Sequence, residues 1–482
     1  MDATDLAFLP ALEQARLIRQ KEITPIDLVE LYLKRIAALD GQLGSYVSVA
    51  AEQAIADAKT KTEALTGDLI DLPLFFGVPI SIKDLNPVMD MPCSYGVKIL
   101  KQQMATEDDG VVTRIKQAGF VILGKTTTSE LGTLPYSEPN GFLPARNPWN
   151  LSYTPGGSSG GAAAALAAGL CPLAQGSDGG GSIRGPAFCC GLVGIKPSRG
   201  RVTLSPFGDR LSGVATNGPL GRTVADTAAL LDVMSGYVTG DPYWLPDPDP
   251  AFLASVEHSP PPLRIAFATH ISPIGPVHPI CQQAVETAAA WLEQMGHQVE
   301  PGCPDFEGLI QPFTTIWQSV VGEASVSIVE FLLGQRRIPN LALGKMNRWL
   351  FRRAESCSSG DYLRAVAVTQ KIARRIVAFF DTVDVLVTPT YMHPTIQVGE
   401  WAHLPPHQTL DQIINWVAPC PPFNVSGQPA IAIPTGFTAE GLPIGVQLVG
   451  RPAAESLLIA LAARLEAAHP WHHHRPAFAV SD

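Results

Sequence analysis

The sequence has few charged residues and no long basic run. Asp, Glu, Lys and Arg make up 16% of its 482 residues, against about 25% in a typical globular domain. Hydrophobic residues make up 46%, the reverse of the balance found in disordered chains. The net charge is −10. A nucleic-acid partner is therefore not expected, because phosphate binding relies on clustered Lys and Arg.

Membrane and secretion signals are also missing. The longest run of small apolar residues, 162–174, is shorter than the roughly 20 residues that span a bilayer. Residues 1–8 contain two aspartates and no basic segment of the kind that opens a signal peptide. The eight cysteines include no Cys-x-x-Cys pair. We expect them to be reduced core residues of a cytoplasmic protein with no metal site and no membrane contact.

Helical and strand patterns alternate along the first part of the chain, which is typical of an α/β fold. The expected helices and strands, in order, are residues 24–41, 46–49, 50–65, 75–85, 111–118 and 120–123. The fourth of these alternates with period two and carries Lys83 near its end. That lysine is expected to be partly buried.

A proline-rich stretch follows at residues 241–262, with seven prolines; it is either a domain linker or a long surface crossing. Beyond it the pattern is mostly helical over residues 278–382. Strands are then expected at 383–389, 429–434 and 445–450, and a helix at 457–468. Strands at both ends indicate one sheet completed by the C-terminal part, and hence a single large domain.

Two clusters of glycine and serine, at residues 154–161 and 176–187, are the candidate active-site segments. Consecutive glycines let neighbouring backbone N–H groups converge on one anion. Neither cluster contains the motif of a P-loop or of a dinucleotide-binding fold. The anion is then more consistent with a transient oxyanion than with a phosphate. Ser182 adjoins Gly181 and is the candidate nucleophile, which needs a base.

Histidine is a poor candidate for that base, since all 11 histidines lie at or beyond His258. A distant histidine can still join a triad, so this only disfavours a Ser-His-Asp site. Residues 156–160 fit the Gly-x-Ser-x-Gly elbow of α/β-hydrolases, but the preceding residues 147–152 do not resemble the strand that such an elbow follows.

A neutral Lys83 is the other base available. Lowering a lysine pKa from about 10.4 to about 7.5 costs about 4 kcal/mol. Burial, together with the positive end of the helix expected to start near Gly160, can supply this. Asp84 would oppose it unless its side chain points to the other face of the strand.

Six segments together resemble the amidase signature family. They are Pro-Ile-Ser-Ile-Lys-Asp at 79–84, Arg-Asn-Pro-Trp-Asn at 146–150, Gly-Gly-Ser-Ser-Gly-Gly at 156–161, Gly-Ser-Asp-Gly-Gly-Gly-Ser-Ile-Arg at 176–184, Gly-Leu-Val-Gly-Ile-Lys-Pro at 191–197 and Phe-Asn-Val-Ser-Gly-Gln-Pro-Ala at 423–430. The intervals of 75 residues between Lys83 and Ser158 and of 24 between Ser158 and Ser182 also fit.

This resemblance implies one amidase domain over residues 1–482, with a central mixed, twisted sheet covered by helices on both faces. The signature core would span about 70–225, the helical middle 278–382, and residues 383–475 would complete the sheet. It also implies a Ser-cisSer-Lys triad. Ser182 would be the nucleophile, Ser158 the bridging serine in a cis peptide, and Lys83 the base.

The family pattern further implies an oxyanion hole of the backbone N–H groups of Gly179, Gly180, Gly181 and Ser182. The family often has Thr or Ile where this chain has Gly179, a change that we expect to add flexibility without removing a donor. Residues Gly132 to Tyr136 should line the acyl side of the pocket, and the helical middle should form the other wall.

The implied activity is hydrolysis of a linear or cyclic carboxamide to an acid and ammonia or an amine, without cofactor or metal. The partner would be a small-molecule amide. The expected pocket segments are largely uncharged, which favours a neutral or hydrophobic acyl group, such as those of amides cleaved by the related cyclic-oligoamide hydrolases. Homodimers are frequent in the family.

Other interpretations stay open. A glutaminase subunit of a tRNA-dependent amidotransferase usually has Ser-Ser-Leu-Asp-Gln shortly after a Gly-Arg-Val, but residues 209–217 differ from that pattern. A catalytically silent binding or scaffold protein is disfavoured by the intact triad residues. Ser158 or Ser159 could instead cap the following helix. Arg184 is expected to be an ion-pair partner, and Ser177 and Asp178 to brace the loop.

Overall fold

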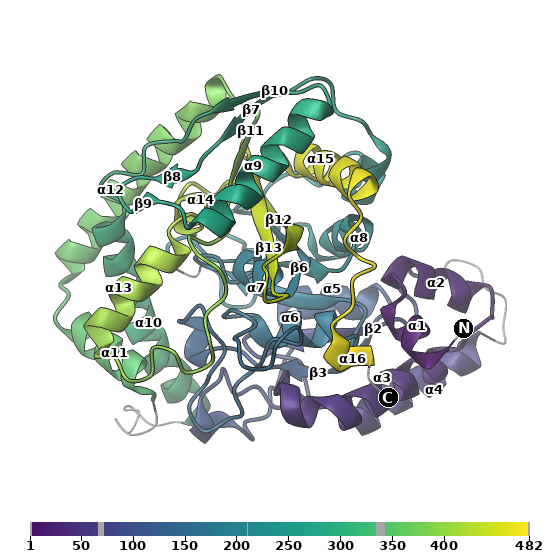
Figure 1. Ribbon diagram of the computed structural model, residues 1–482. Helices are drawn as coiled ribbons and strands as arrows, with labels where there is room; N and C mark the ends of the chain where they lie inside the picture. The colour runs from purple at the N-terminus through teal and green to yellow at the C-terminus, as the bar shows by residue number, and fades with distance from the viewer. Residues whose placement is uncertain (1, 66–71, 210, 334–342, 481–482) are drawn as a thin grey trace.

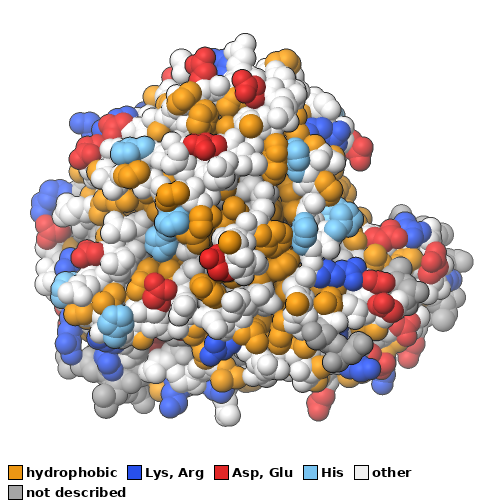
Figure 2. Space-filling view, viewed as in Figure 1, with side chains coloured by type: hydrophobic (Ala, Val, Ile, Leu, Met, Phe, Trp, Pro, Cys, Tyr) orange, Lys and Arg blue, Asp and Glu red, His pale blue; other side chains and the backbone are white. Residues whose placement is uncertain are grey.

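The computed structural model describes residues 2–65, 72–209, 211–333 and 343–480. None of the helices in these ranges is long and apolar enough to cross a membrane. On the face shown in Figure 2, Lys and Arg side chains are scattered among Asp and Glu and form no continuous basic patch.

One sheet of eleven strands runs through the centre of the molecule, in the order β1-β3-β2-β4-β6-β5-β12-β13-β11-β7-β10. Their bounds are β1 Tyr46–Val49, β2 Pro79–Lys83, β3 Val121–Thr126, β4 Ala174–Asp178, β5 Val193–Lys196, β6 Thr216–Gly221, β7 Arg264–Phe267, β10 Gln298–Pro301, β11 Val385–Pro389, β12 Ala430–Phe437 and β13 Pro443–Gly450. A separate two-stranded ribbon consists of β8 His270–Ile271 and β9 Gly275–Pro276. Because β2 is parallel to β3 and β4 while β4 is antiparallel to β6, the sheet is mixed.

Helices surround this sheet (Figure 1). They are α1 Ala3–Phe8, α2 Ala11–Arg19, α3 Pro25–Leu43, α4 Ala51–Ala64, α5 Gly110–Gln117, α6 Gly160–Ala167, α7 Arg184–Cys190, α8 Val224–Met234, α9 Pro279–Gln294, α10 Ile310–Leu333, α11 Lys345–Glu355, α12 Ser359–Ala378, α13 Pro406–Val417, α14 Pro421–Val425, α15 Glu455–Ala468 and α16 Ala477–Val480. The N-terminal helices lie at one end of the molecule, and α10 to α13 lie at the opposite end.

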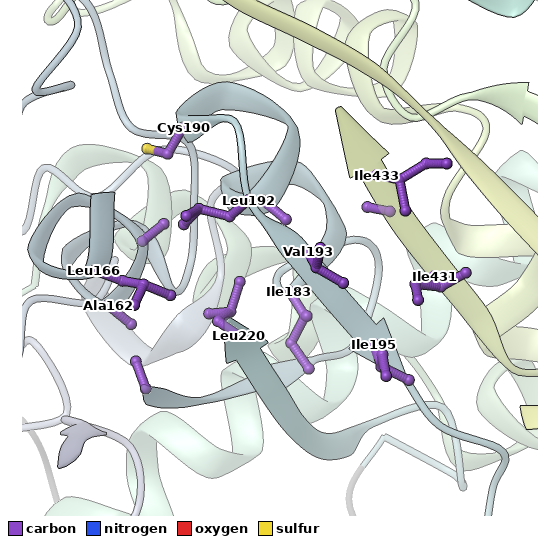
Figure 3. Packing of buried hydrophobic residues seen from close by; sticks show 14 of the residues in the cluster. Ala162, Leu166, Ile183, Cys190, Leu192, Val193, Ile195, Leu220, Ile431 and Ile433 are labelled. Atoms are coloured by element: carbon purple, nitrogen blue, oxygen red, sulfur yellow. The ribbon is translucent and has the colours of Figure 1, made fainter. Parts of the chain in front are cut away.

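Most of the buried apolar side chains belong to one large cluster that runs from Ala7 to Ala479, and two smaller clusters lie apart from it. Figure 3 shows part of the large cluster, where Leu220 on β6 lies between Leu166 on α6 and Val193 on β5, and Ile431 on β12 follows beyond Val193. N-terminal and C-terminal strands therefore share one core. The expected fold class, a mixed α/β domain with helices around a central sheet, is confirmed.

Several expected boundaries differ from the structure. The first long helix continues past Gly41 to Leu43 and ends at Gly44, whose φ of +61° suits glycine. Strand β10 interrupts the expected helical middle, and β5 and β6 were not predicted. The proline-rich stretch is a crossing within the domain, because β6 before it and β7 after it belong to the same sheet.

Candidate active site

The candidate catalytic residues meet at one end of three neighbouring segments. Strand β2 ends at Lys83, its parallel neighbour β4 ends at Asp178, and Ser158 lies two residues before the start of helix α6 at Gly160. Parallel neighbouring strands place their carboxyl ends at the same edge of a sheet. The exposed fractions are 0% for Lys83, 1% for Ser158 and 8% for Ser182. The reacting groups are thus largely shielded from bulk water.

Lys83 is held by hydroxyl and carbonyl oxygens. Its Nζ lies 2.8 Å from Oγ of Ser158, 3.0 Å from Oγ of Ser177 and 3.2 Å from the carbonyl oxygen of Ser177. Ser177, expected only to brace a loop, therefore contacts the candidate base directly. This contact could not be inferred from the sequence, because residues 176–178 were expected as loop and instead belong to β4.

Burial lowers the pKa of Lys83 to about 7, while the negative charge of Asp178 acts in the opposite direction. The neighbouring Asp84 points elsewhere: its carboxylate lies 3.2 Å from Nζ of Lys125 and accepts a hydrogen bond from the Ser94 backbone at 3.1 Å. The Asp84 side chain thus points away from Lys83, so its negative charge does not stabilise the charged form of that lysine. A substantial fraction of Lys83 is neutral near pH 7.

Ser158 follows a cis peptide bond from Gly157. A Cβ atom on Gly157 would lie 2.4 Å from the Tyr136 backbone nitrogen, so only glycine fits this close approach. Neither serine caps α6. Ser159 occupies the N-cap position without a side-chain cap, and Oγ of Ser158 lies beside Lys83. The capping interpretation of these serines is wrong.

The glycine loop before Ser182 is braced by Asp178. Its carboxylate accepts hydrogen bonds from the backbone N–H groups of Gly181, at 2.7 Å, and Ile183, at 3.1 Å. Within the part of the chain that the structure describes, the N–H groups of Gly179, Gly180 and Ser182 have no acceptor. Of the four N–H groups predicted for an oxyanion hole, that of Gly181 is therefore already bonded to Asp178.

Side chains from other parts of the chain fill the space beside Gly179. A Cβ atom there would lie 3.0 Å from Cδ1 of Leu211 and 3.2 Å from Cζ3 of Trp317. These two side chains occupy the position of the larger residue that the family often has. The expectation that Gly179 makes the loop more flexible is not supported by this packing.

Arg184 is the ion-pair partner that the sequence indicated. Its Nη2 lies 3.0 Å from Oδ1 of Asp178, and both side chains are fully buried. Although burial alone would raise the pKa of Asp178, the Arg184 charge and hydrogen bonds hold it well below its usual range. The pair fixes the carboxylate that braces the glycine loop.

Replacing Arg184 by methionine should therefore lower the free energy of unfolding by about 3–5 kcal/mol, the cost of leaving a buried charge without its partner. Urea unfolding measures this change. Arg264→Met is the matched control, since the Arg264–Asp384 pair lies at the surface and its loss should matter far less. Equal unfolding midpoints for both variants would contradict this account.

Two cavities meet at Ser182. The first, about 110 Å³, is lined largely by apolar side chains from residues 133–135, α10, α11 and α13. The second is a wider cleft of about 900 Å³ that also contains Ser158. Trp317 of α10 lines both. The helical middle does supply one wall, but the contribution of α13 was not foreseen.

The predicted substrate-binding residues line three different cavities. Thr133, Leu134 and Pro135 line the apolar cavity, whereas Gly132 lines the wide cleft, where a Cβ atom would lie 3.5 Å from Oγ of Ser158. Tyr136 lines a third cavity and stacks edge-on against Trp401, with the ring centres 5.8 Å apart. Ser182 is not among the residues that line this third cavity, whereas the backbone nitrogen of Tyr136 packs against Gly157, the residue before Ser158.

Comparisons with known proteins agree with this geometry. The amidase family model matches residues 27–459. A protein of Synechocystis sp. that is named an amidase is 52% identical over 96% of this chain and 89% of its own length. The structure of a 6-aminohexanoate cyclic dimer hydrolase superposes with a TM-score of 0.92 at 32% identity, covering 98% of this chain and 99% of that one. A bacterial aryl acylamidase of the amidase signature family gives a TM-score of 0.88 at 25% identity, covering 98% and 99%.

Proposed function

Because the chain belongs to the amidase signature family and is an amide-hydrolysing enzyme, we propose that Ser182, Ser158 and Lys83 form its catalytic triad. The supporting observation is the distance of 2.8 Å between Nζ of the buried Lys83 and Oγ of Ser158. The neutral form of a lysine in contact with a serine hydroxyl can accept its proton. Small-molecule amides are the substrates.

In the proposed reaction, Oγ of Ser182 attacks the carbonyl carbon of the amide. Its proton moves to Oγ of Ser158 while the Ser158 proton moves to Nζ of Lys83. The new oxyanion faces the free N–H groups of Gly179, Gly180 and Ser182, which stabilise the charge as it develops. Asp178 supports this loop by accepting hydrogen bonds from the N–H groups of Gly181 and Ile183.

The intermediate then collapses and its C–N bond breaks. The departing nitrogen takes a proton from Ser158, which regains one from Lys83, so that the amine leaves neutral and Ser182 stays acylated. Water attacks the ester and gives a proton to the same relay. The acid is released and Ser182 recovers its hydroxyl. No cofactor or metal takes part in this scheme.

The pH dependence tests the proposed base. Lys83 must be neutral to accept a proton, and its pKa is about 7. We therefore expect kcat/KM to rise about tenfold per pH unit below this value and to level off above it. Initial rates of amine release between about pH 5 and pH 9 measure the profile. A flat profile across this range would contradict a lysine base.

A further inference from the structure

The two cavities that meet at Ser182 differ in their access to the proton relay. Ser158 lines only the wide cleft, whereas Gly180 and Gly181 line only the apolar cavity. The leaving nitrogen must lie against Ser158, because Ser158 gives it a proton in the proposed reaction. The amine half of the substrate therefore belongs in the wide cleft, and the acyl half belongs in the apolar cavity.

The apolar cavity offers no partner for a charge. No Asp, Glu, Lys, Arg or His is among the described residues that line it. Even the Tyr391 hydroxyl points toward helix α7, since a Cβ atom on Gly185 would overlap it. An ion would enter this space without compensation, which is strongly unfavourable.

The size of the apolar cavity limits the acyl group. Its volume is about 110 Å³, and an apolar cavity of about 150 Å³ in a protein core accommodates benzene. Phe313 and Trp317 stack against each other at its base, with the ring centres 5.7 Å apart. A Cβ atom on Gly180 would lie 3.5 Å from Cζ of Phe313, so this wall directly adjoins the oxyanion loop.

The wide cleft is larger and more polar than the apolar cavity. Ser158, Ser177, Asp178 and Asn217 are among the residues that line it. The carboxylate of Asp178 at its inner end is already neutralised by Arg184. At about 900 Å³ the cleft is much larger than ammonia needs. Its size suits a bulky amine half.

From these observations we infer that the enzyme acts on secondary amides in one orientation. The acyl group is uncharged and apolar and no larger than one ring or a short hydrocarbon chain, and the amine half is bulky. This inference rests on the proposed function, because it uses Ser158 as the proton donor. Trp317 separates the two halves of the substrate.

Two isomers with reversed amide bonds test the orientation. N-aminoethyl hexanamide has a hydrocarbon chain on its acyl side and an ammonium on its amine side. In β-alanine pentylamide the ammonium is on the acyl side and the hydrocarbon chain is on the amine side. We expect kcat/KM for the first to exceed that for the second by at least about 100-fold, since the second must bury an ammonium in the apolar cavity. Glutamine, which carries two charges on its acyl side, should be turned over no better than β-alanine pentylamide.

Phe313→Glu checks that the cavity wall causes this preference. A carboxylate there gives an ammonium a partner, so the variant should hydrolyse β-alanine pentylamide faster than the wild type does and N-aminoethyl hexanamide more slowly. Phe313→Leu is the matched control and should keep the wild-type preference. A Phe313→Glu variant that hydrolyses neither compound is followed by Trp317→Ala, which joins the two cavities and should reduce the preference at least about tenfold.

The outcomes separate the two proposals. Turnover that survives in Ser182→Ala overturns the proposed triad. If Ser182→Ala is inactive while the wild type hydrolyses both isomers equally or prefers β-alanine pentylamide, only the substrate inference fails. If the wild type hydrolyses neither isomer but a fluorophosphonate still labels Ser182, the substrate inference fails and the proposed triad stands. An unchanged preference in an active Phe313→Glu variant, or in Trp317→Ala where Phe313→Glu is inactive, also overturns the substrate inference.

Discussion

Replacing Ser182 by alanine should lower kcat for a secondary amide by at least about 10,000-fold, the usual consequence of removing a serine nucleophile. No acyl-enzyme can form without Oγ, although the donors of the glycine loop remain. Within the described residues this hydroxyl makes no hydrogen bond, and the side chain is 8% exposed. We therefore expect the free energy of unfolding to change by less than about 1 kcal/mol. Amine release and urea unfolding measure the two effects.

Ser159→Ala is the matched control for that variant. Ser159 is buried next to Ser158, but its hydroxyl donates only to the carbonyl of Ser177, at 3.3 Å. Losing this bond should lower kcat by no more than about tenfold. Similar losses in the two variants would mean that the site is sensitive to any nearby change, and the assignment of Ser182 as nucleophile would lose its support.

Replacing Lys83 by methionine should lower kcat by at least about 1,000-fold and remove the inflection of the pH profile near pH 7. Methionine is unbranched and one atom shorter than lysine, and it cannot accept a proton. Because the lysine is fully buried, removing its amine also removes a cost of desolvation. The variant should fold, which circular dichroism and thermal unfolding can check.

A second buried lysine provides an unusually close control. Burial also lowers the pKa of Lys196 to about 7, but its Nζ donates to the carbonyl oxygen of Pro197, at 2.9 Å, and does not contact Ser158. Lys196→Met should therefore keep the inflection. If the inflection persists in Lys83→Met and disappears in Lys196→Met, Lys83 is not the base.

Much of this site could be predicted from the sequence. The glycine–serine clusters placed Ser158 and Ser182 beside an anion-binding loop, and the position of the histidines directed attention to Lys83. The strand that carries Lys83 was recognisable by its alternating pattern. These features depend on residues that are close together in the chain, so they can be recognised in a single sequence.

Non-local packing explains what was missed. The residues of β4 have weak strand propensity, yet β4 forms because β2 and β6 pair with it on both sides. The bond from the Gly181 N–H to Asp178 depends on the exact path of the loop. The wall formed by Phe313 and Trp317 comes from a helix more than a hundred residues away from Ser182. No spacing in the sequence indicates such contacts.

The central claim is that Ser182 is the nucleophile and that Ser158 and Lys83 activate it. Its most direct test is a fluorophosphonate probe, followed by proteolysis and mass spectrometry of the labelled peptide. The account predicts one adduct, on Ser182, that is absent from Ser182→Ala and forms much more slowly in Lys83→Met. An adduct on Ser158 or on any other residue, or no adduct on the folded wild-type protein, would contradict it.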